Sequence, residues 1–355
     1  MAGSVHASPR AKARAKTYGT RIVLLSLTLA LSGCLSVKTP GYVLRHRDQL
    51  EQQLNVKIDI SHANSFTGNV DRVLNDIDRQ LSPLPAAFRA KIARIAVRDG
   101  FFREYMLLAP AVGAYTAKNG TVFIRNANAT RFLQNALLFP GNDVLMHEAT
   151  HSVQYYEMKH WGQTGRPTPE FARLIRNWEL QYLGDANRDG EIDDLDIGWI
   201  QQHRAAFDKN KDGTVDFKDV ELAYGKPYVQ GNWISADGLK VFLRMSFGGI
   251  VPRPNGYPSS YAKTYVWEDA AETMRWMWSA GLLPALYSNS SESAAADKAW
   301  ERYEELKKRD PLFARKVFLM LQYVAAHEKP EQLSSRWVDY TRRHSVIASV
   351  KTAAQ

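Results

Sequence analysis

The residues best suited to do chemistry are His147, Glu148 and His151, in the stretch VLMHEATHSVQ of residues 144–154. The apolar start of this stretch, with Asn142 and Asp143 before it to cap the first turn, predicts a helix. On a helix, two histidines four residues apart project from one face, one turn above the other. Both imidazoles can then bind one Zn²⁺ at about 2.0–2.1 Å. Glu148 is placed beside the first ligand to take a proton from a water molecule at the metal.

A third ligand must come from elsewhere in the chain, because a catalytic zinc usually has three protein ligands and one open position. The extended motif, in which a glycine and a third histidine follow, does not fit, since Gln154 and Glu157 stand at those positions. A downstream glutamate is therefore expected, and there are two candidates. Glu268 lies in the segment WEDAAETM of residues 267–274, and Glu170 lies nearer to the histidines.

Two loops of one kind occupy residues 185–196 and 208–219. In each loop, oxygen-bearing side chains stand at positions 1, 3, 5, 9 and 12, and a glycine stands at position 6, where the chain turns sharply. Ca²⁺ takes about 6–8 oxygen ligands, which this pattern can supply. The predicted calcium-binding residues are Asp185, Asn187, Asp189, Glu191, Asp193 and Asp196 in the first loop, and Asp208, Asn210, Asp212, Thr214, Asp216 and Asp219 in the second.

The segments YAKT of residues 261–264 and EDAAE of residues 268–272 accompany the H-E-x-x-H stretch. Together they resemble a branch of the gluzincin metallopeptidases that includes anthrax lethal factor. The resemblance implies that Glu268 binds zinc, that Glu272 orients a ligand from one helical turn further on, and that Tyr261 stabilises the oxyanion. It also implies a zincin fold, with a mixed sheet ahead of the metal-binding helix. On this basis Glu268 is favoured over Glu170 as the third ligand.

The paired calcium loops carry Asp at position 12, with a helix expected between them, and they resemble the duplicated calcium repeat of dockerin domains. Dockerins bind cohesin modules, often through small hydroxyl residues at positions 10 and 11. Here those positions hold Asp194 and Leu195, then Phe217 and Lys218. The sequence therefore favours a structural, calcium-clamped insertion over a module that binds a cohesin-type partner. Weak sites of this kind would fill outside the cytoplasm, where calcium is abundant.

Residues 1–33 are typical of a secretory signal, with five basic residues, no acid, and an apolar run at 22–31 that is too short to span a bilayer. The run ends in the residues LSGC, whose Cys34 is the single cysteine of the chain. This ending resembles the lipobox of bacterial lipoproteins, which implies cleavage before Cys34, lipidation there and anchorage at the cell envelope. An ordinary secreted protein is the alternative. Without the five basic residues the net charge falls from +9 to +4, which indicates no nucleic-acid partner.

The periodicity of the chain predicts a helix within residues 68–93, a strand at Ile92–Val97, a hairpin over 112–124, and amphipathic helices over 298–324 and 330–350. The hairpin is either a plain one or an edge that pairs with an extended substrate. The expected fold class is α+β, a zincin-like domain with a paired EF-hand-type insertion. The expected division begins with a signal peptide over 1–33 and a tether over 34–60. The first part of the zincin domain follows over 61–184, then the calcium insertion over 185–224, and then the second part of the zincin domain over 225–350.

The function that these residues predict is that of a zinc-dependent endopeptidase of the bacterial cell envelope, with a peptide or protein as its substrate. Glu148 would act as general base and Tyr261 would donate to the oxyanion. The alternative is a surface interaction protein without catalysis, whose calcium module docks a partner. The presence of Glu148 favours the enzyme, because a degenerate scaffold usually loses this residue first.

Overall fold

The structure is a computed structural model. It describes residues 39–63, 70–98, 114–117, 119–125, 144–180, 183–189, 192, 194–224, 258, 262, 266–287 and 293–342. Some residues named above lie outside these ranges: Cys34 with its leader, the helix-capping Asn142 and Asp143, Glu191 and Asp193 of the first calcium loop, and Tyr261.

A four-stranded mixed sheet forms one side of the molecule, with strand order β1-β2-β4-β3. Its strands are β1 (Ile58–His62), β2 (Arg94–Arg98), β3 (Ala114–Thr116) and β4 (Thr121–Arg125). Strand β2 pairs in parallel with β1 and β4, whereas β3 pairs antiparallel with β4 and lies at the edge. The predicted strand at Ile92–Val97 corresponds to β2. The predicted hairpin corresponds to β3 and β4, with the turn before Thr121.

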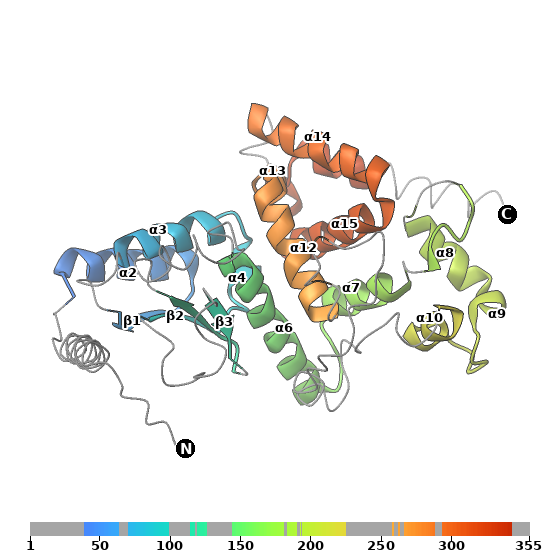
Figure 1. Cartoon of the computed structure of the whole chain (residues 1–355), viewed down its shortest axis with the longest axis horizontal. Helices are drawn as coiled ribbons and strands as arrows, with labels where there is room; N and C mark the ends of the chain where they lie inside the picture. Colours follow the sequence, from blue (N-terminus) through green and yellow to red (C-terminus); the bar gives the residue numbers. More distant parts are fainter. Residues whose placement is uncertain are drawn as a thin grey trace, which may run out of the picture.

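Two helices run beside the sheet, α2 (Gly41–Leu54) and α3 (Val70–Leu81), and they pack against each other (Figure 1). Helix α3 is amphipathic and buries one stripe of apolar residues, Val70, Val73, Leu74, Ile77 and Leu81. The helix expected within 68–93 therefore ends at Leu81, and the short helix α4 (Ala86–Arg89) follows it. Much of the segment expected to be a tether, residues 34–60, belongs instead to α2 and β1, because both bury apolar side chains in the core.

The long helix α6 (Val144–Thr164) connects the sheet to the helices of the second half. It contacts β3, β4 and α3 on one side and α12 (Val266–Ala280) on the other. Ser152 of α6 connects this helix to the hairpin through its hydroxyl group. The hydroxyl donates to the carbonyl of Gly120 at 2.5 Å and accepts from the amide of Ala93, just before β2, at 3.1 Å. Gly120 has φ +79° and lies close to both partners, so the turn requires glycine there.

Within the described residues, the second half is built mainly of helices. These are α7 (Pro169–Leu180), α12, α13 (Leu282–Ala285), α14 (Ala294–Arg309) and α15 (Pro311–Ala325), followed by a 3₁₀ turn at Pro330–Gln332 and a helical stretch at 335–342. The prediction of one helix over 298–324 is wrong, since α14 and α15 are separate. Asp310 ends the first and caps the second, accepting from the amide of Phe313 at 3.0 Å, and Pro311 begins α15.

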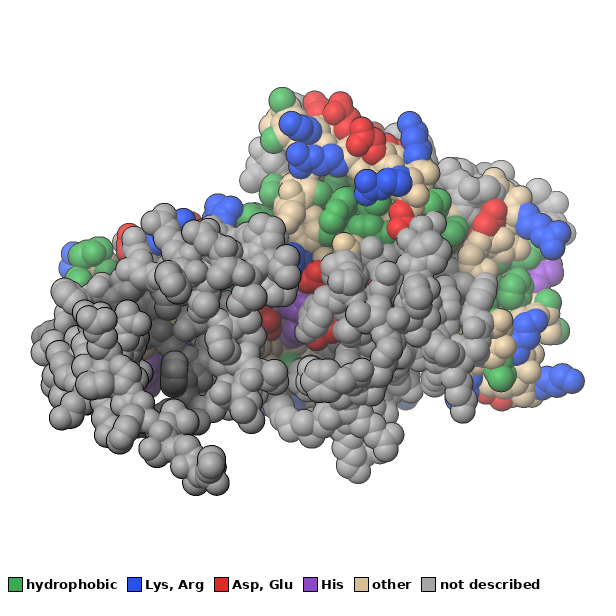
Figure 2. Space-filling view, viewed as in Figure 1, with side chains coloured by type: hydrophobic (Ala, Val, Ile, Leu, Met, Phe, Trp, Pro, Cys, Tyr) green, Lys and Arg blue, Asp and Glu red, His purple; other side chains and the backbone are tan. Residues whose placement is uncertain are grey.

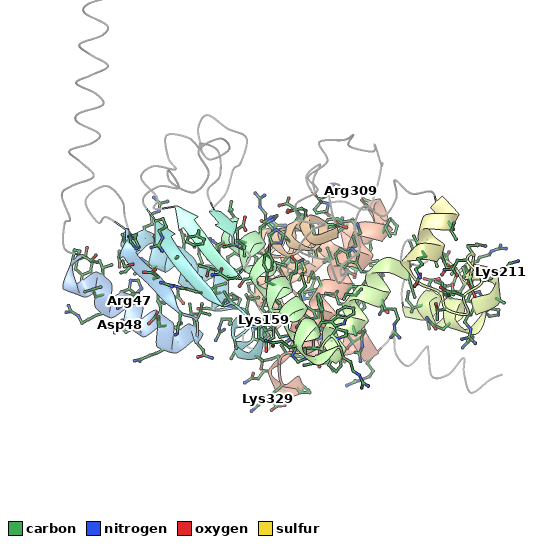
Figure 3. The ribbon with its side chains drawn as sticks, turned by 90° about the horizontal axis from the view of Figure 1, so that it is seen from below. Arg47, Asp48, Lys159, Lys211, Arg309 and Lys329 are labelled. Carbon is green, nitrogen blue, oxygen red and sulfur yellow. The ribbon has the colours of Figure 1, made fainter. Side chains whose placement is uncertain are left out.

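The calcium-loop segment forms a small module of α8 (Asp194–Gln202), α9 (Arg204–Phe207) and α10 (Phe217–Tyr224). Leu180, Ile197 and Ile200 form a small core for it, and Phe207 and Val215 pack against this core. The module lies at the opposite end of the molecule from α2; in Figure 3, Lys211 marks one end and Arg47 the other. The described architecture is thus helix-rich α+β, while the zincin and EF-hand assignments stay predictions.

Candidate metal centre

His147, Glu148 and His151 lie in the first turns of α6, and all three side chains are buried. Residues Leu145–Gln154 are all buried, and the two histidines are each 7% exposed while Glu148 is 9% exposed. Ionisable side chains are rarely buried to this degree unless they are paired or bind a metal. The burial therefore requires partners for all three.

Helix α12 supplies the nearest partner, because it packs along α6 and carries Glu268 in its first turn. Glu268 Oε2 lies 3.1 Å from His147 Nε2 and 3.2 Å from His151 Nε2, and the two Nε2 atoms are 3.1 Å apart. These three residues form a buried group that could hold a metal ion, because their ligand atoms all lie within 4.8 Å of one another. In Figure 2, small areas of histidine and acidic side chains are visible beside one another near the middle of the view.

The dimensions of this triangle fit a zinc ion. Tetrahedral ligands at about 2.0–2.1 Å from zinc are separated from one another by roughly 3.3–3.4 Å. The observed separations of 3.1, 3.2 and 3.1 Å are within a few tenths of an ångström of that value. Two imidazole nitrogens and one carboxylate oxygen are also a donor set that zinc takes in catalytic sites, with a further position left open.

The other ring nitrogen of each histidine has its own partner. His147 Nδ1 lies 2.9 Å from Glu272 Oε1, and His151 Nδ1 lies 2.7 Å from Gln154 Oε1. Both partner atoms are acceptors, so a proton on each Nδ1 would leave each Nε2 with a lone pair directed toward the other Nε2 and Glu268. Three acceptors this close repel one another unless positive charge lies among them. The arrangement therefore calls for a cation.

Without a metal, the pKa directions place this positive charge on the imidazoles themselves. Burial acts to lower the pKa of His147, but the hydrogen bonds to Glu268 and Glu272 outweigh it and raise that pKa to about 10. Burial likewise opposes the charge of His151, whose pKa is nevertheless raised by the carboxylate of Glu268. Burial acts to raise the pKa of Glu268, yet the two histidines hold it well below its usual range. The carboxylate stays ionised and positive charge is held beside it.

Glu148 points toward the sheet. Its Oε2 lies 2.7 Å from Thr116 Oγ1, at the end of β3, and its backbone carbonyl oxygen lies 2.8 Å from the same hydroxyl.

Thr116 and Gln154 were not among the predicted site residues. Gln154 could have been found, because it stands three positions after His151 on the same helix face. No spacing in the sequence points to Thr116.

Two other glutamates, Glu157 and the candidate Glu170, lie away from the histidines. Glu157 is fully buried in an ion pair with Lys91 and accepts from Tyr323 Oη at 2.9 Å. Glu170, the runner-up ligand, lies in the first turn of α7 and lines a separate small pocket with residues of α7 and α15. The structure thus brings Glu268, and not Glu170, to the two histidines.

The two calcium loops share one backbone arrangement. Position 12 of each is buried and accepts from the amides at positions 2 and 3: Asp196 from Ala186 and Asn187, and Asp219 from Lys209 and Asn210. In both, the amide at position 5 donates to the side chains at positions 1 and 3. The residue at position 4 of each has positive φ, at 62° and 60°. The repeat seen in the sequence is therefore also a repeat in conformation.

Comparison of the chain with protein-family models, with curated proteins and with solved structures found no match. Within the described ranges, no helix is long and apolar enough to cross a membrane.

Proposed function

We propose that this protein is a zinc-dependent endopeptidase. The observation that carries the proposal is the convergence of His147 Nε2, His151 Nε2 and Glu268 Oε2, all within 3.2 Å of one another, with Glu148 on the adjoining helical position. A structural zinc site is normally closed by four Cys and His ligands, whereas this set has three ligands and a neighbouring acid. Such a set is suited to hydrolysis rather than to holding a fold together.

The mechanism assigns a separate task to each side chain. Zinc bound by this set would lower the pKa of water and polarise the carbonyl of a peptide bond. Glu148 takes the proton of the attacking water and returns it to the leaving amine. Glu272 and Gln154 hold the two imidazoles in the tautomer and orientation that direct Nε2 inward. The resemblance noted above assigns Tyr261 the role of oxyanion donor.

The test of this function is peptide hydrolysis by the zinc-loaded protein, with denatured casein as substrate and fragments identified by mass spectrometry. Glu148→Gln should retain zinc and lose at least about 10²-fold in rate, because general base catalysis typically contributes that much. Glu170→Gln is the matched control, as it removes a carboxylate from the neighbouring helix, and it should cleave at the parental rate. Cleavage by Glu148→Gln at the parental rate would rule out the mechanism.

The module of α8, α9 and α10 is proposed to bind calcium and to stabilise the fold. The shared backbone arrangement of its loops supports this, as does the burial of Asp196 and Asp219. Calcium should raise the melting temperature of the protein. Asp208→Ala should remove the part of this rise that comes from calcium binding to the second loop. An unchanged melting temperature at millimolar calcium would contradict the structural role.

The cell-envelope location is a separate proposal and rests on the sequence of the leader. Mass spectrometry of the protein from a bacterial membrane fraction should find an acylated amino-terminal Cys34, and Cys34→Ser should move the protein to the soluble fraction. An unmodified thiol on the mature chain would show an ordinary secreted protein instead.

A further inference from the structure

One side chain outside the motif contacts the proposed general base. Thr116 is the last residue of the edge strand β3 and pairs in register with Val122 of β4. Its Oγ1 lies 2.7 Å from Glu148 Oε2 and 2.8 Å from the backbone carbonyl oxygen of Glu148. Both of these oxygens are acceptors and the hydroxyl has one proton, so the hydroxyl shares that proton between the carboxylate and the carbonyl oxygen of the same residue.

The strand is itself held firmly at this point. The turn between β3 and β4 is closed by the amide of Ala117 donating to the carbonyl of Thr121 at 2.9 Å. Ser152 then ties Gly120 of that turn to α6 at 2.5 Å, one residue after His151. The threonine hydroxyl thus reaches Glu148 from a strand that is fixed to the same helix, which is a rigid support for a long side chain.

We propose that Thr116 is a positioning residue for Glu148 and fixes its carboxylate for proton transfer. This inference rests on the proposed function. A glutamate has three rotatable side-chain bonds, and without a partner it would sample several rotamers. Contact with Oε2 fixes the carboxyl group by one oxygen and leaves Oε1 for the water and the leaving amine. The hydroxyl has one proton and two lone pairs, so it can also accept from Glu148 after the proton transfer.

The test replaces the hydroxyl while keeping the shape of the side chain. Thr116→Val removes the hydrogen bond, and Thr116→Ser retains it. The valine variant should lose about tenfold or more in kcat, the range expected for a hydrogen bond to a charged group, with KM and zinc content unchanged. The serine variant should return close to the parental kcat. Thr116→Ala serves the same purpose if the valine variant does not fold.

A readout independent of turnover uses acetohydroxamic acid, which binds zinc as an anion and leaves a proton for a nearby base. Its affinity for the zinc-loaded protein, measured by calorimetry, should fall about tenfold or more in Thr116→Val and in Glu148→Gln, and should be parental in Thr116→Ser. A purely structural role for Thr116 would instead lower the melting temperature and the zinc content.

The outcomes separate this inference from the function on which it rests. Parental kcat and acetohydroxamate affinity in Thr116→Val, beside an inactive Glu148→Gln, would overturn the role of Thr116 and leave the peptidase standing. Parental activity in Glu148→Gln would overturn both, since there would be no base to position.

Discussion

Each histidine of the candidate centre has an acceptor atom close to the ring nitrogen that faces away from the triangle. Glu272 lies 2.9 Å from His147 Nδ1, and Gln154 lies 2.7 Å from His151 Nδ1. Arg275 Nη1 in turn donates to Glu272 Oε1 at 3.3 Å. The order of partners outward from the centre is imidazole, carboxylate and guanidinium. The orientation of the ligands is therefore set by residues that would not themselves bind the metal.

Removal of the outer carboxylate should weaken zinc binding. Glu272→Ala takes away the acceptor that fixes the tautomer of His147, and outer partners of this kind contribute about 10–100-fold in metal affinity. Competition with a chromophoric chelator measures the change. Glu301→Ala, at an exposed position on α14, is the control and should bind zinc as the parent does. Equal affinities in the two variants would show that Glu272 does not orient the ligand.

At the scale of elements, the centre is an interface between α6 and α12, with the β3–β4 hairpin on the other side of α6. Behind α12, Lys316 of α15 forms a fully buried ion pair with Asp269, at 2.5 Å. Asp269 directly follows Glu268, so this pair sets the rotation of α12 at the ligand. A buried pair of this kind adds little net stability, but removal of one partner is costly.

The contribution of the buried ion pair to stability can be tested by removing one partner and then by replacing both. Asp269→Asn should lower the free energy of unfolding by about 3–5 kcal/mol, because it leaves the charge of Lys316 buried without its counter-ion. The double variant Asp269→Leu with Lys316→Met should recover much of the loss. Urea unfolding gives both values. A single variant as stable as the parent would mean that α12 does not depend on this pair.

The turn of the hairpin offers a second test at this scale. Gly120→Ala introduces a Cβ at φ +79°, 3.3 Å from Ala93 Cβ and 3.4 Å from Ser152 Oγ. Gly165→Ala is the matched control, since Gly165 has φ +71° with nothing within 4 Å of an added Cβ. Both should lose about 1–2 kcal/mol to backbone strain, and Gly120→Ala should lose more in urea unfolding because it also crowds α6. Equal losses would show that the close approach is unimportant.

At the scale of the whole molecule, a buried polar cluster joins the sheet half to the helical half. Lys91, just before β2, contacts Glu157 of α6 and, at 2.5 Å, Nε2 of His327 beyond α15. His327 Nδ1 donates to the carbonyl of Tyr323 at 2.7 Å, so the imidazole is neutral and accepts from Lys91. Protonation of His327 would place two positive charges together in this cluster.

The cluster predicts a stability that falls in mild acid. Burial and then the charge of Lys91 lower the pKa of His327 below its ordinary value of 6.5. A lowered pKa in the fold means that the unfolded chain binds the proton more tightly. The stabilisation is therefore present above about pH 6.5 and is lost as the pH falls through the lower, folded value. Urea midpoints from pH 8 to 5 should fall more for the parent than for His327→Gln, and parallel curves would contradict this.

The sequence predicted those parts of the centre that depend on local spacing. His147, Glu148 and His151 follow from the helical repeat alone. Glu268 lies more than a hundred residues further on, and only a resemblance singled it out, because spacing does not say which helices pack together. Thr116 depends on strand register and on the packing of the sheet against α6, which a single sequence does not contain.

The errors in the predicted fold have physical reasons as well. The helix break at Asp310 and Pro311 was signalled by a cap followed by a proline, but the apolar periodicity continues across it and conceals the change of axis. The segment expected to be a tether has a weak apolar stripe, yet Val43, Leu50 and Leu54 are buried against the core. Local signals therefore decided the first case, and tertiary packing decided the second.

The most direct test of the account is the metal content of the purified protein, measured by inductively coupled plasma mass spectrometry beside three single variants. We expect roughly one zinc per chain in the parent and in Glu170→Ala, and a loss of zinc in His147→Ala and Glu268→Ala. The result that would contradict the account is a parent without zinc after incubation with the metal and dialysis. Retention of zinc in Glu268→Ala, with its loss in Glu170→Ala, would move the third ligand to α7.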